Sequence, residues 1–402
     1  MKKDSSTAPR YAKRKLEIVA CATRLINSRG LGNFTIADVA REIGIVATGV
    51  WYYFKTKDLL AAACYKHAIE EYQQLLADSA NADRPAQRVE SFLMRFTERQ
   101  RKVALGETHQ ICYFDEISSL EDPDIFSAYG NMFRSVRGLL DLRPSTEERV
   151  GINARTHLLL SQILWMASWI EDYDPREYGR IAKRAHDILF NGLAAPGSAC
   201  NPVVLPYQVL RPPVESSPYE AYLQAATQLI NEKGAASASV NNIAAKLNVT
   251  KGGFYHHIES KEDLITACFE RSIETMWNVI EAAEASSETA LQALTSIAAT
   301  LLQYRNTADD PLLRQPALAT LGETTRTHLN KKYHHIAQRF ASLICDGMVD
   351  GSIRPLDANV ASTMLVATIM SAGDLRIWVP TVTAETVFEQ YGVPMFRGIF
   401  HR

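Results

Sequence analysis

Residues 44–57 read GIVATGVWYYFKTK, and 204 positions further along, residues 248–261 read NVTKGGFYHHIESK. Both segments are rich in aromatic residues, end in lysine and follow an amphipathic run. Aligned at this offset, residues 16–64 and 220–268 share twelve identities in 49 positions without a gap. Self-similarity of this kind indicates that one structural unit occurs twice in the chain.

The repetition extends to the ends of both halves. FNGL, residues 190–193, matches FRGI, residues 396–399, so the repeat is a whole domain pair rather than a solenoid motif. Between the halves, residues 194–218 contain six of the sixteen prolines. Proline removes backbone donors and favours extended geometry, so we expect a linker there.

The rest of the sequence favours helix. Residues 17–27 carry Ile18, Cys21, Leu25 and other apolar side chains at helical spacing. Gly30 and its repeat partner Gly234 stand where a C-cap glycine would end each helix. No segment shows sustained alternation of polar and apolar residues, so we predict an all-α fold.

The composition is that of an ordinary globular protein, with 47% hydrophobic and 22% charged residues. The net charge of −2 conceals a basic start, because residues 1–57 hold eleven Lys or Arg against four Asp or Glu. Such a bias is a weak indication of a polyanionic partner. The six cysteines lie far apart without CxxC or zinc-ligand spacing, which predicts buried thiols in a reducing compartment.

The sequence also favours a cytoplasmic location without membrane insertion. The charged N-terminus is not followed by the apolar stretch of a signal peptide. The longest apolar run, HLLLSQILWMASWI at residues 157–170, is shorter than a bilayer span.

A helix-turn-helix is predicted around the first aromatic segment. Thr35 and Asp38 form a capping-box pattern at the start of a short helix over residues 35–43. Gly44 and Ile45 supply a tight turn, and a second short helix is expected over residues 46–54. In the second copy, Ser239 takes the place of Thr35.

These segments resemble the DNA-binding domain of the TetR/AcrR family of transcriptional regulators. The family pattern runs roughly Gly-Val-Ser-Lys-Gly-Thr-Leu-Tyr-His-Tyr-Phe-x-Ser-Lys. The second copy matches it at Val249, Lys251, Gly252, Tyr255, His256, Ser260 and Lys261. The first copy matches it at Gly44, Tyr53, Phe54 and Lys57.

The residue chemistry supports the same role. Small residues at the head of the second short helix allow close approach to the major groove, and aromatic hydroxyls at its far end can reach phosphates. A lysine at the start of the following helix joins a cation to free amides, and a basic arm adds affinity that falls with salt. The predicted DNA-binding residues are Lys13, Arg14, Thr35, Ala47, Thr48, Gly49, Trp51, Tyr52, Tyr53, Lys57, Ser239, Thr250, Lys251, Gly252, Gly253, Tyr255, His256 and Lys261.

The two copies differ at positions that matter for recognition. Ala47 and Trp51 stand where the family pattern has Lys and Tyr, and Val46 replaces the hydroxyl cap that Thr250 retains. We therefore expect the two copies to read different sequences, or the first to depend more on its basic arm. The operator would be an imperfect palindrome or two unlike half-sites.

The resemblance also implies a domain plan, since members of the family are homodimers with one DNA-binding domain and one larger helical ligand and dimerisation domain per subunit. Here one chain would form an intrachain pseudo-dimer. Its heads would lie about 34–36 Å apart, in successive major grooves. The expected domains are DNA-binding domain 1 at 1–58, ligand domain 1 at 59–193, the linker at 194–218, DNA-binding domain 2 at 219–262 and ligand domain 2 at 263–402. The expected four-helix seam combines 146–171 and 176–193 with 357–378 and 384–400.

A small-molecule effector is expected inside one or both helical domains. The segment ILWMASWIEDYDP, residues 163–175, resembles the corresponding region of regulators that respond to acyl-CoA or other lipid-derived metabolites, so we expect a hydrophobic effector. The simpler alternative is that the same side chains only form the core. The candidate pocket residues are Ile111, Phe114, Phe126, Met132, Phe133, Trp165, Met166, Trp169, Trp277, Tyr304, Met364 and Met370.

Repression relieved by the effector is the expected mechanism, with no cofactor and no metal. An enzyme is disfavoured because the sequence has no GxSxG, P-loop, GxGxxG or HExxH motif, and the pair His334 and His335 fits a solvated helix face. The alternative that stays open is a helical interaction protein with one or both DNA-binding heads inactive. Ala47 and Trp51 are the residues that favour it.

Overall fold

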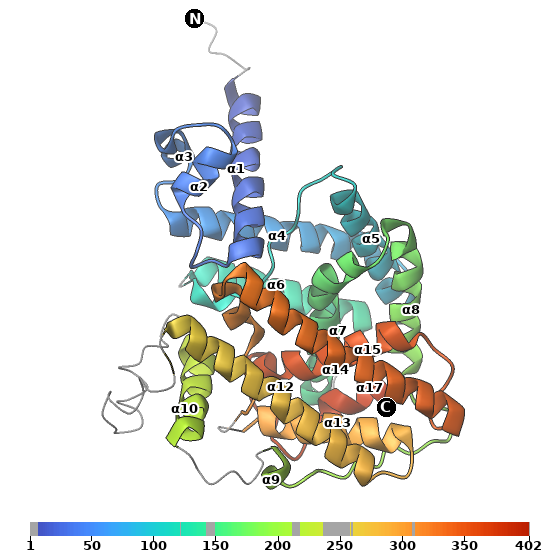
Figure 1. Ribbon diagram of the computed structural model, residues 1–402. Helices are drawn as coiled ribbons and strands as arrows, with labels where there is room; N and C mark the ends of the chain where they lie inside the picture. Colours follow the sequence, from blue (N-terminus) through green and yellow to red (C-terminus); the bar gives the residue numbers. More distant parts are fainter. Residues whose placement is uncertain are drawn as a thin grey trace, which may run out of the picture.

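The computed structural model describes residues 7–120, 122–141, 149–210, 218–235, 258, 260–307 and 310–401. Within these ranges every regular element is helical, and a single β-bridge joins Ala194 to Ile353. The predicted all-α class is therefore confirmed. The chain forms two units, drawn from blue to green and from yellow to red in Figure 1.

The first unit begins with the helices that form head 1, which are α1 (Thr7–Arg29), α2 (Ile36–Glu42) and α3 (Ala47–Tyr53). Its body, called body 1, consists of α4 (Lys57–Ser79), α5 (Pro85–Ala104), α6 (Pro123–Leu140), α7 (Arg149–Trp169) and α8 (Tyr178–Asn191). In body 1, α4 packs on α6 and α5 packs on α8.

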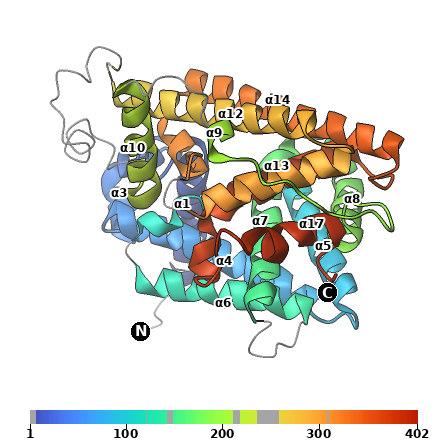
Figure 2. The same ribbon diagram turned by 90° about the horizontal axis from the view of Figure 1, so that it is seen from below.

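The second unit repeats this order. Head 2 begins with α10 (Pro218–Lys233), the counterpart of α1. Body 2 consists of α12 (Lys261–Ala285), α13 (Ala290–Arg305), the 3₁₀ helix η6 (Gln315–Thr320), α14 (Glu323–Asp350), α15 (Ala358–Ser371), α16 (Leu375–Trp378), the π-helix η8 (Phe388–Gly392) and α17 (Val393–Arg397). Figures 1 and 2 both place α10 at the same end of the helical bodies as head 1.

Equivalent residues make equivalent contacts in the two units. The thiol of Cys64 approaches the carbonyl oxygen of Val19 at 3.6 Å, and the repeat partner Cys268 approaches that of Leu223 at 3.7 Å. Four cysteines are buried as expected, whereas Cys200 is half-buried and Cys345 is exposed. The prediction of buried thiols is wrong for Cys345, because its side chain lies on the solvent face of α14.

The last segment of the second unit differs from the prediction. A continuous helix was expected over residues 384–400, but the chain forms η8 and then the short α17. Pro394 lacks the backbone N–H that an α-helix needs there, and Gly398 leaves the helical region with φ +98°. The helix expected over 357–378 is also interrupted, because α15 ends at Ser371 and a 3₁₀ turn precedes α16.

The two bodies pack through α7 and α8 on one side and α15, η8 and α17 on the other. These are the segments that the sequence assigned to the seam. Gln162 on α7 is fully buried there and donates to the carbonyl oxygen of Met364 at 3.0 Å and to the hydroxyl of Thr368 at 2.9 Å. His157, one turn earlier, donates from Nε2 to the carbonyl oxygen of Ser371 at 3.0 Å.

The repeated FNGL and FRGI segments cross each other at this seam. A Cβ on Gly192 would lie 2.2 Å from the carbonyl oxygen of Phe396, and one on Gly398 would lie 2.2 Å from that of Phe190. The amide of Leu193 donates to Phe396 across the crossing at 2.8 Å. Only glycine permits so close a backbone approach, which explains why both copies carry it.

The described part of the proline-rich segment, residues 194–210, is bound to body 2. Val203 and Leu205 donate their amides to the hydroxyls of Ser296 and Thr300, one turn apart on α13, at 2.9 and 3.0 Å. The linker then forms the short α9 (Tyr207–Leu210), which packs on α12. This segment is therefore attached to the second unit through α13 and α12.

The segment Ala358–Trp378 is apolar and long enough to cross a membrane by composition, and 72% of it is buried inside the protein. Its main helix, α15, packs on α7 and α14. The burial identifies it as a core helix of the two-unit body.

Candidate nucleic-acid interface

Head 1 has the predicted helix-turn-helix geometry. The Thr35 hydroxyl accepts from the amide of Asp38, and the Asp38 carboxylate accepts from the amide of Thr35, both at 3.1 Å, so the predicted capping box is confirmed. Gly44 turns the chain with φ +70°, and the amide of Ile45 donates to Ala40 at 2.9 Å. This turn places α3 across α2, where Val50 is fully buried.

The start of α3 lacks a side-chain cap. Val46 occupies the N-cap position in an extended conformation and supplies no cap hydrogen bond, as its side chain predicts. Gly49 has a packing role that the sequence did not reveal, since a Cβ there would come within 3.2 Å of the Ile45 side chain. Glycine at this position lets α3 pack against the turn and also leaves the outer side of the helix open.

The outer side of α3 presents large apolar and aromatic side chains to solvent. Val46 is 70% exposed, Trp51 49% and Tyr52 66%. Thr48 is also exposed, while Ala47 and Tyr53 are half-buried. The predicted contact residues of this helix therefore lie together on one accessible surface.

The basic arm is helical and is held against α3. Tyr11 on α1 packs its ring 4.8 Å from that of Tyr53. Lys15, one turn after Tyr11, lies over the ring of Phe54 at 5.4 Å, and Lys13, midway between them, is exposed. Arg14 pairs with Glu17 on the same helix at 2.7 Å, which offsets part of its charge. The arm thus brings cations to the edge of the α3 surface.

Lys57 is oriented differently from the expected phosphate-binding position. Its ammonium donates to the carbonyl oxygen of Gly32 at 3.0 Å and lies 4.9 Å from the centre of the Phe34 ring. Partial burial lowers the pKa of this ammonium. In this conformation Lys57 joins α4 to the loop before α2, and its contact with DNA stays a prediction.

Most of the predicted contact residues of head 2 lie outside the described residues. These are Ser239, Thr250, Lys251, Gly252, Gly253, Tyr255 and His256. Lys261 is described and exposed at the start of α12. The preceding Ser260 forms a complete capping box with Asp263, whereas the equivalent Thr56 of head 1 caps α4 through the amide of Leu59 alone.

Each head is fastened to its own body by one asparagine. Asn27 on α1 donates to the carbonyl oxygen of Ile111 and accepts from the amide of Tyr113, both at 2.9 Å. Asn231 on α10 makes the same pair of bonds with Leu312 and Arg314, at 3.0 and 2.9 Å. We call each pair an asparagine clamp. The identity of Asn27 and Asn231 in the repeat was the signal that could have revealed it.

Head 1 also contacts the opposite body. Gly30 ends α1 with φ +79°. A Cβ added at this glycine would lie only 3.2 Å from the Cβ of Ala319 in η6. Arg326 on α14 donates to the carbonyl oxygen of Ser28 at 2.5 Å. At Gly234, the equivalent glycine with the same φ, no described residue comes within 4 Å of such a Cβ.

Comparison with known proteins agrees with the repeated geometry. The family described as "Bacterial regulatory proteins, tetR family" matches the chain at residues 18–64 and again at residues 223–268. The chain carries two TetR-family domains in tandem.

Two curated TetR-like relatives share a short region with the chain. The transposon Tn10 TetC protein of Escherichia coli is 39% identical over 57 residues, which is 14% of this chain and 29% of that protein. The uncharacterized HTH-type transcriptional regulator YvdT of Bacillus subtilis (strain 168) is 42% identical over 59 residues, 15% of this chain and 30% of YvdT. The chain thus spans about 30% of the length of these relatives.

One solved structure is similar to part of the chain. The structure of AibR in complex with isovaleryl coenzyme A and operator DNA is 22% identical, with a TM-score of 0.37. The match covers 44% of this chain and 97% of the AibR chain.

The predicted effector-pocket residues of the two bodies are mainly core side chains. Phe133 stacks on Trp378 with ring centres 4.1 Å apart, and Tyr304 packs on Tyr207 of the linker helix. Phe126 is 43% exposed, because the buried face of α6 runs through Ile125 and its helical neighbours and leaves Phe126 on the solvent side. The remaining candidates are buried or half-buried. They are Ile111, Phe114, Met132, Trp165, Met166, Trp169, Trp277, Met364 and Met370.

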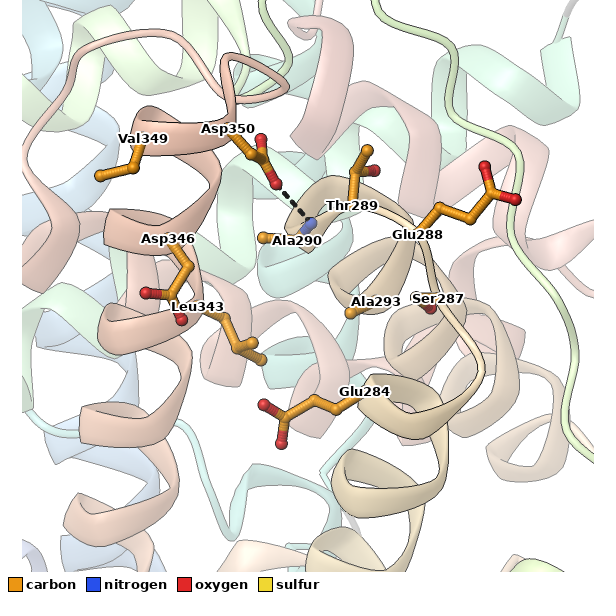
Figure 3. Close-up of a pocket in the computed structure, with 10 residues that line it drawn as sticks. All are labelled: Glu284, Ser287, Glu288, Thr289, Ala290, Ala293, Leu343, Asp346, Val349 and Asp350. Carbon is orange, nitrogen blue, oxygen red and sulfur yellow. Dashed lines mark hydrogen bonds between the residues drawn. The ribbon is translucent and has the colours of Figure 1, made fainter.

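Two hollows among the described residues are lined by other side chains. One, of about 380 Å³, lies among α12, α13 and α14 and is surrounded by Glu284, Glu288, Asp346 and Asp350 (Figure 3). The other, of about 300 Å³, lies where α7, the linker and α17 meet, and its lining includes two arginines. The first combines these carboxylates with apolar side chains such as Leu343 and Val349, and the second is mainly polar. Neither is lined by any of the predicted pocket residues.

Proposed function

We propose that the chain is a ligand-responsive, DNA-binding transcriptional regulator of the cytoplasm. In this proposal one chain is the complete pseudo-dimer, with domains at 1–58, 59–193, 219–262 and 263–402 and the linker at 194–218. Its partner is a pseudo-palindromic operator, either an imperfect palindrome or two unlike half-sites. The observation that carries the proposal is the surface of head 1, where the exposed side chains of α3 adjoin a helical arm that packs Tyr11 on Tyr53 and Lys15 over Phe54.

The contacts between the bodies support the intrachain pseudo-dimer. The buried Gln162 makes two hydrogen bonds into α15, and the glycine crossing joins the ends of the two units. A hydrophobic interface of this kind holds the two bodies in one relative position. Each clamp then transmits that position to a head, because Asn27 and Asn231 join the heads to loops of the bodies.

The proposed response is a two-state change. A hydrophobic effector, with an acyl-CoA or another lipid-derived metabolite as the leading class, would favour a spacing of the heads that no longer fits the operator. Binding of the effector would thereby relieve repression. Addition of an effector that leaves operator affinity unchanged would contradict this part of the proposal.

The DNA-binding role can be tested with duplexes enriched from a randomised pool by the purified chain. Fluorescence anisotropy at several salt concentrations should show affinity falling with salt. Lys13→Ala should reduce the slope by about one counterion. Lys331→Ala, an exposed substitution on α14, serves as the control and should leave the slope unchanged.

The alternative is a helical interaction protein with one or both heads inactive. It is favoured by the uncharged α3 and by Lys57, which is engaged within head 1. Lys57→Ala and Lys261→Ala separate the two readings. If both heads bind DNA, Lys261→Ala should lower the affinity for the operator, and that affinity should still depend on the half-site of head 1. If one head is inactive, the chain should bind a duplex with a single half-site at full affinity.

A further inference from the structure

The side chains on the surface of α3 limit which bases this helix can recognise. The helix sequence ATGVWYY contains no charged residue, and its polar groups on the accessible side are the hydroxyls of Thr48 and Tyr52 and the indole N–H of Trp51. The side chains that usually distinguish guanine and adenine in the major groove are Arg, Lys, Asn and Gln. None of them occurs on this helix.

The apolar side chains are available instead. Val46 and Trp51 are exposed at the first and last turns of α3, and Tyr52 lies beside Trp51. Single exposed apolar residues are common, but here three of them occur within one seven-residue helix and its N-cap position. We call Val46, Trp51 and Tyr52 the apolar patch of head 1.

The charges around the patch favour nucleic acid as its occupant. Lys15 on the arm lies over the ring of Phe54, the C-cap residue of α3, and Lys55 follows directly and is exposed. The arm is positioned by the contact of Tyr11 with Tyr52 and Tyr53. An apolar centre with cations at its edge fits a groove whose floor holds bases and whose rims hold phosphates.

In a major groove, the apolar feature of the bases is the C5 methyl group of thymine. We infer that head 1 selects its half-site by apolar contact of Val46 and Trp51 with thymine methyl groups. The inference rests on the proposed DNA-binding function. Head 2 has Thr250, Lys251 and Tyr255 at the corresponding positions, so its half-site should not depend on methyl groups to the same degree.

Deoxyuridine substitution tests this contact, because it removes the methyl group and keeps every base-pair hydrogen bond. Operators enriched from a randomised pool would be prepared with uracil in place of thymine in one half-site at a time. Each contacted methyl should contribute about fourfold in affinity in the half-site of head 1. The same exchange in the other half-site should change affinity by less than about twofold.

Two variants assign the effect to the apolar patch. In Trp51→Ala and in Val46→Thr, uracil and thymine operators should bind with affinities closer to each other than in the wild type. Val46→Thr keeps the size of the side chain and restores a hydroxyl cap, so it preserves the helix. Thermal unfolding of both variants confirms that they fold.

The outcomes separate the two proposals. Equal affinity for uracil and thymine operators, or a uracil effect that persists undiminished in both variants, overturns the inference and leaves the DNA-binding function standing. A chain that enriches no duplex overturns the DNA-binding function, and the inference falls with it.

Discussion

Head 1 and head 2 begin alike and are attached differently. Both first helices end in a glycine with φ +79°, and both are fastened to their own body by an asparagine clamp. Head 1 also contacts the opposite unit. Ala319 lies against Gly30, and Arg326 donates a hydrogen bond to the carbonyl oxygen of Ser28. Among the described residues, Gly234 of head 2 has no such neighbour.

This difference shows what a fused repeat can do that a homodimer cannot. In a symmetric homodimer every contact occurs twice. Here the contacts that both heads make with their own bodies come from residues that are identical in the two copies. The additional contacts of head 1 with body 2 involve residues found in a single copy. Body 2 therefore contacts head 1 directly, and in the proposed regulator the two heads need not respond equally.

The glycine crossing should give the largest effect, since it holds both units. Gly192→Ala and Gly398→Ala each drive a Cβ to 2.2 Å from a carbonyl oxygen at a positive φ. We expect each to lower the free energy of unfolding by about 3–4 kcal/mol, the sum of overpacking and left-handed strain. Urea unfolding measures this. A loss below about 1 kcal/mol in either variant would contradict the crossing.

The asparagine clamps should give the next largest effect, and an equal one in both units. Asn27→Ala and Asn231→Ala each remove two hydrogen bonds from backbone groups of a body loop. We expect a loss of about 2–3 kcal/mol for each by urea unfolding. A clear inequality between the two variants would show that the heads are not fastened by the same means.

His157 makes the seam sensitive to pH. Burial lowers the pKa of its imidazole below the ordinary value of 6.5. The unfolded chain then binds the proton more readily, so the stability is present above pH 6.5 and is lost as the pH falls below it, by at most about 1.4 kcal/mol per unit. His157→Gln keeps a donor for Ser371, and its unfolding should depend less on pH between 6.5 and 5.5 than that of the wild type. Identical pH profiles would refute this role.

The smallest expected effect separates the two heads directly. Gly30→Ala and Gly234→Ala place alanine at the same φ and share a strain of about 1–2 kcal/mol. Gly30→Ala should cost about 1 kcal/mol more, because Ala319 and Glu116 must also move. Calorimetric unfolding of the two variants tests the difference. Equal losses would mean that the contact with body 2 does not constrain head 1.

Local patterns in the sequence predicted much of this molecule. The capping box at Thr35, the glycine that ends α1 and the segments of the seam all follow from short-range spacing or from the repeat. The contacts that the sequence did not reveal depend on distant partners. Lys57 donates to the carbonyl oxygen of Gly32, linker amides donate to two hydroxyls on α13, and Gly30 lies against Ala319. These groups are distant in sequence and come together only through tertiary packing.

The second unit shows a further limit of pattern reading. Its last segment was expected to be one helix, and its end, FRGI, matches FNGL at the end of the first unit. Pro394 and Gly398 override that pattern, and the segment becomes η8 and α17. The exposed Phe126 shows the same limit for the pocket, since an aromatic side chain does not by its type indicate which face of its helix is buried.

The number of chains on one operator tests the central claim most directly. Native mass spectrometry of the complex with an enriched duplex should show one chain per duplex, and the complex should weaken strongly when either half-site is scrambled. Two chains on each duplex, or full affinity for a duplex that keeps only one half-site, would contradict the account of a single chain that spans both half-sites.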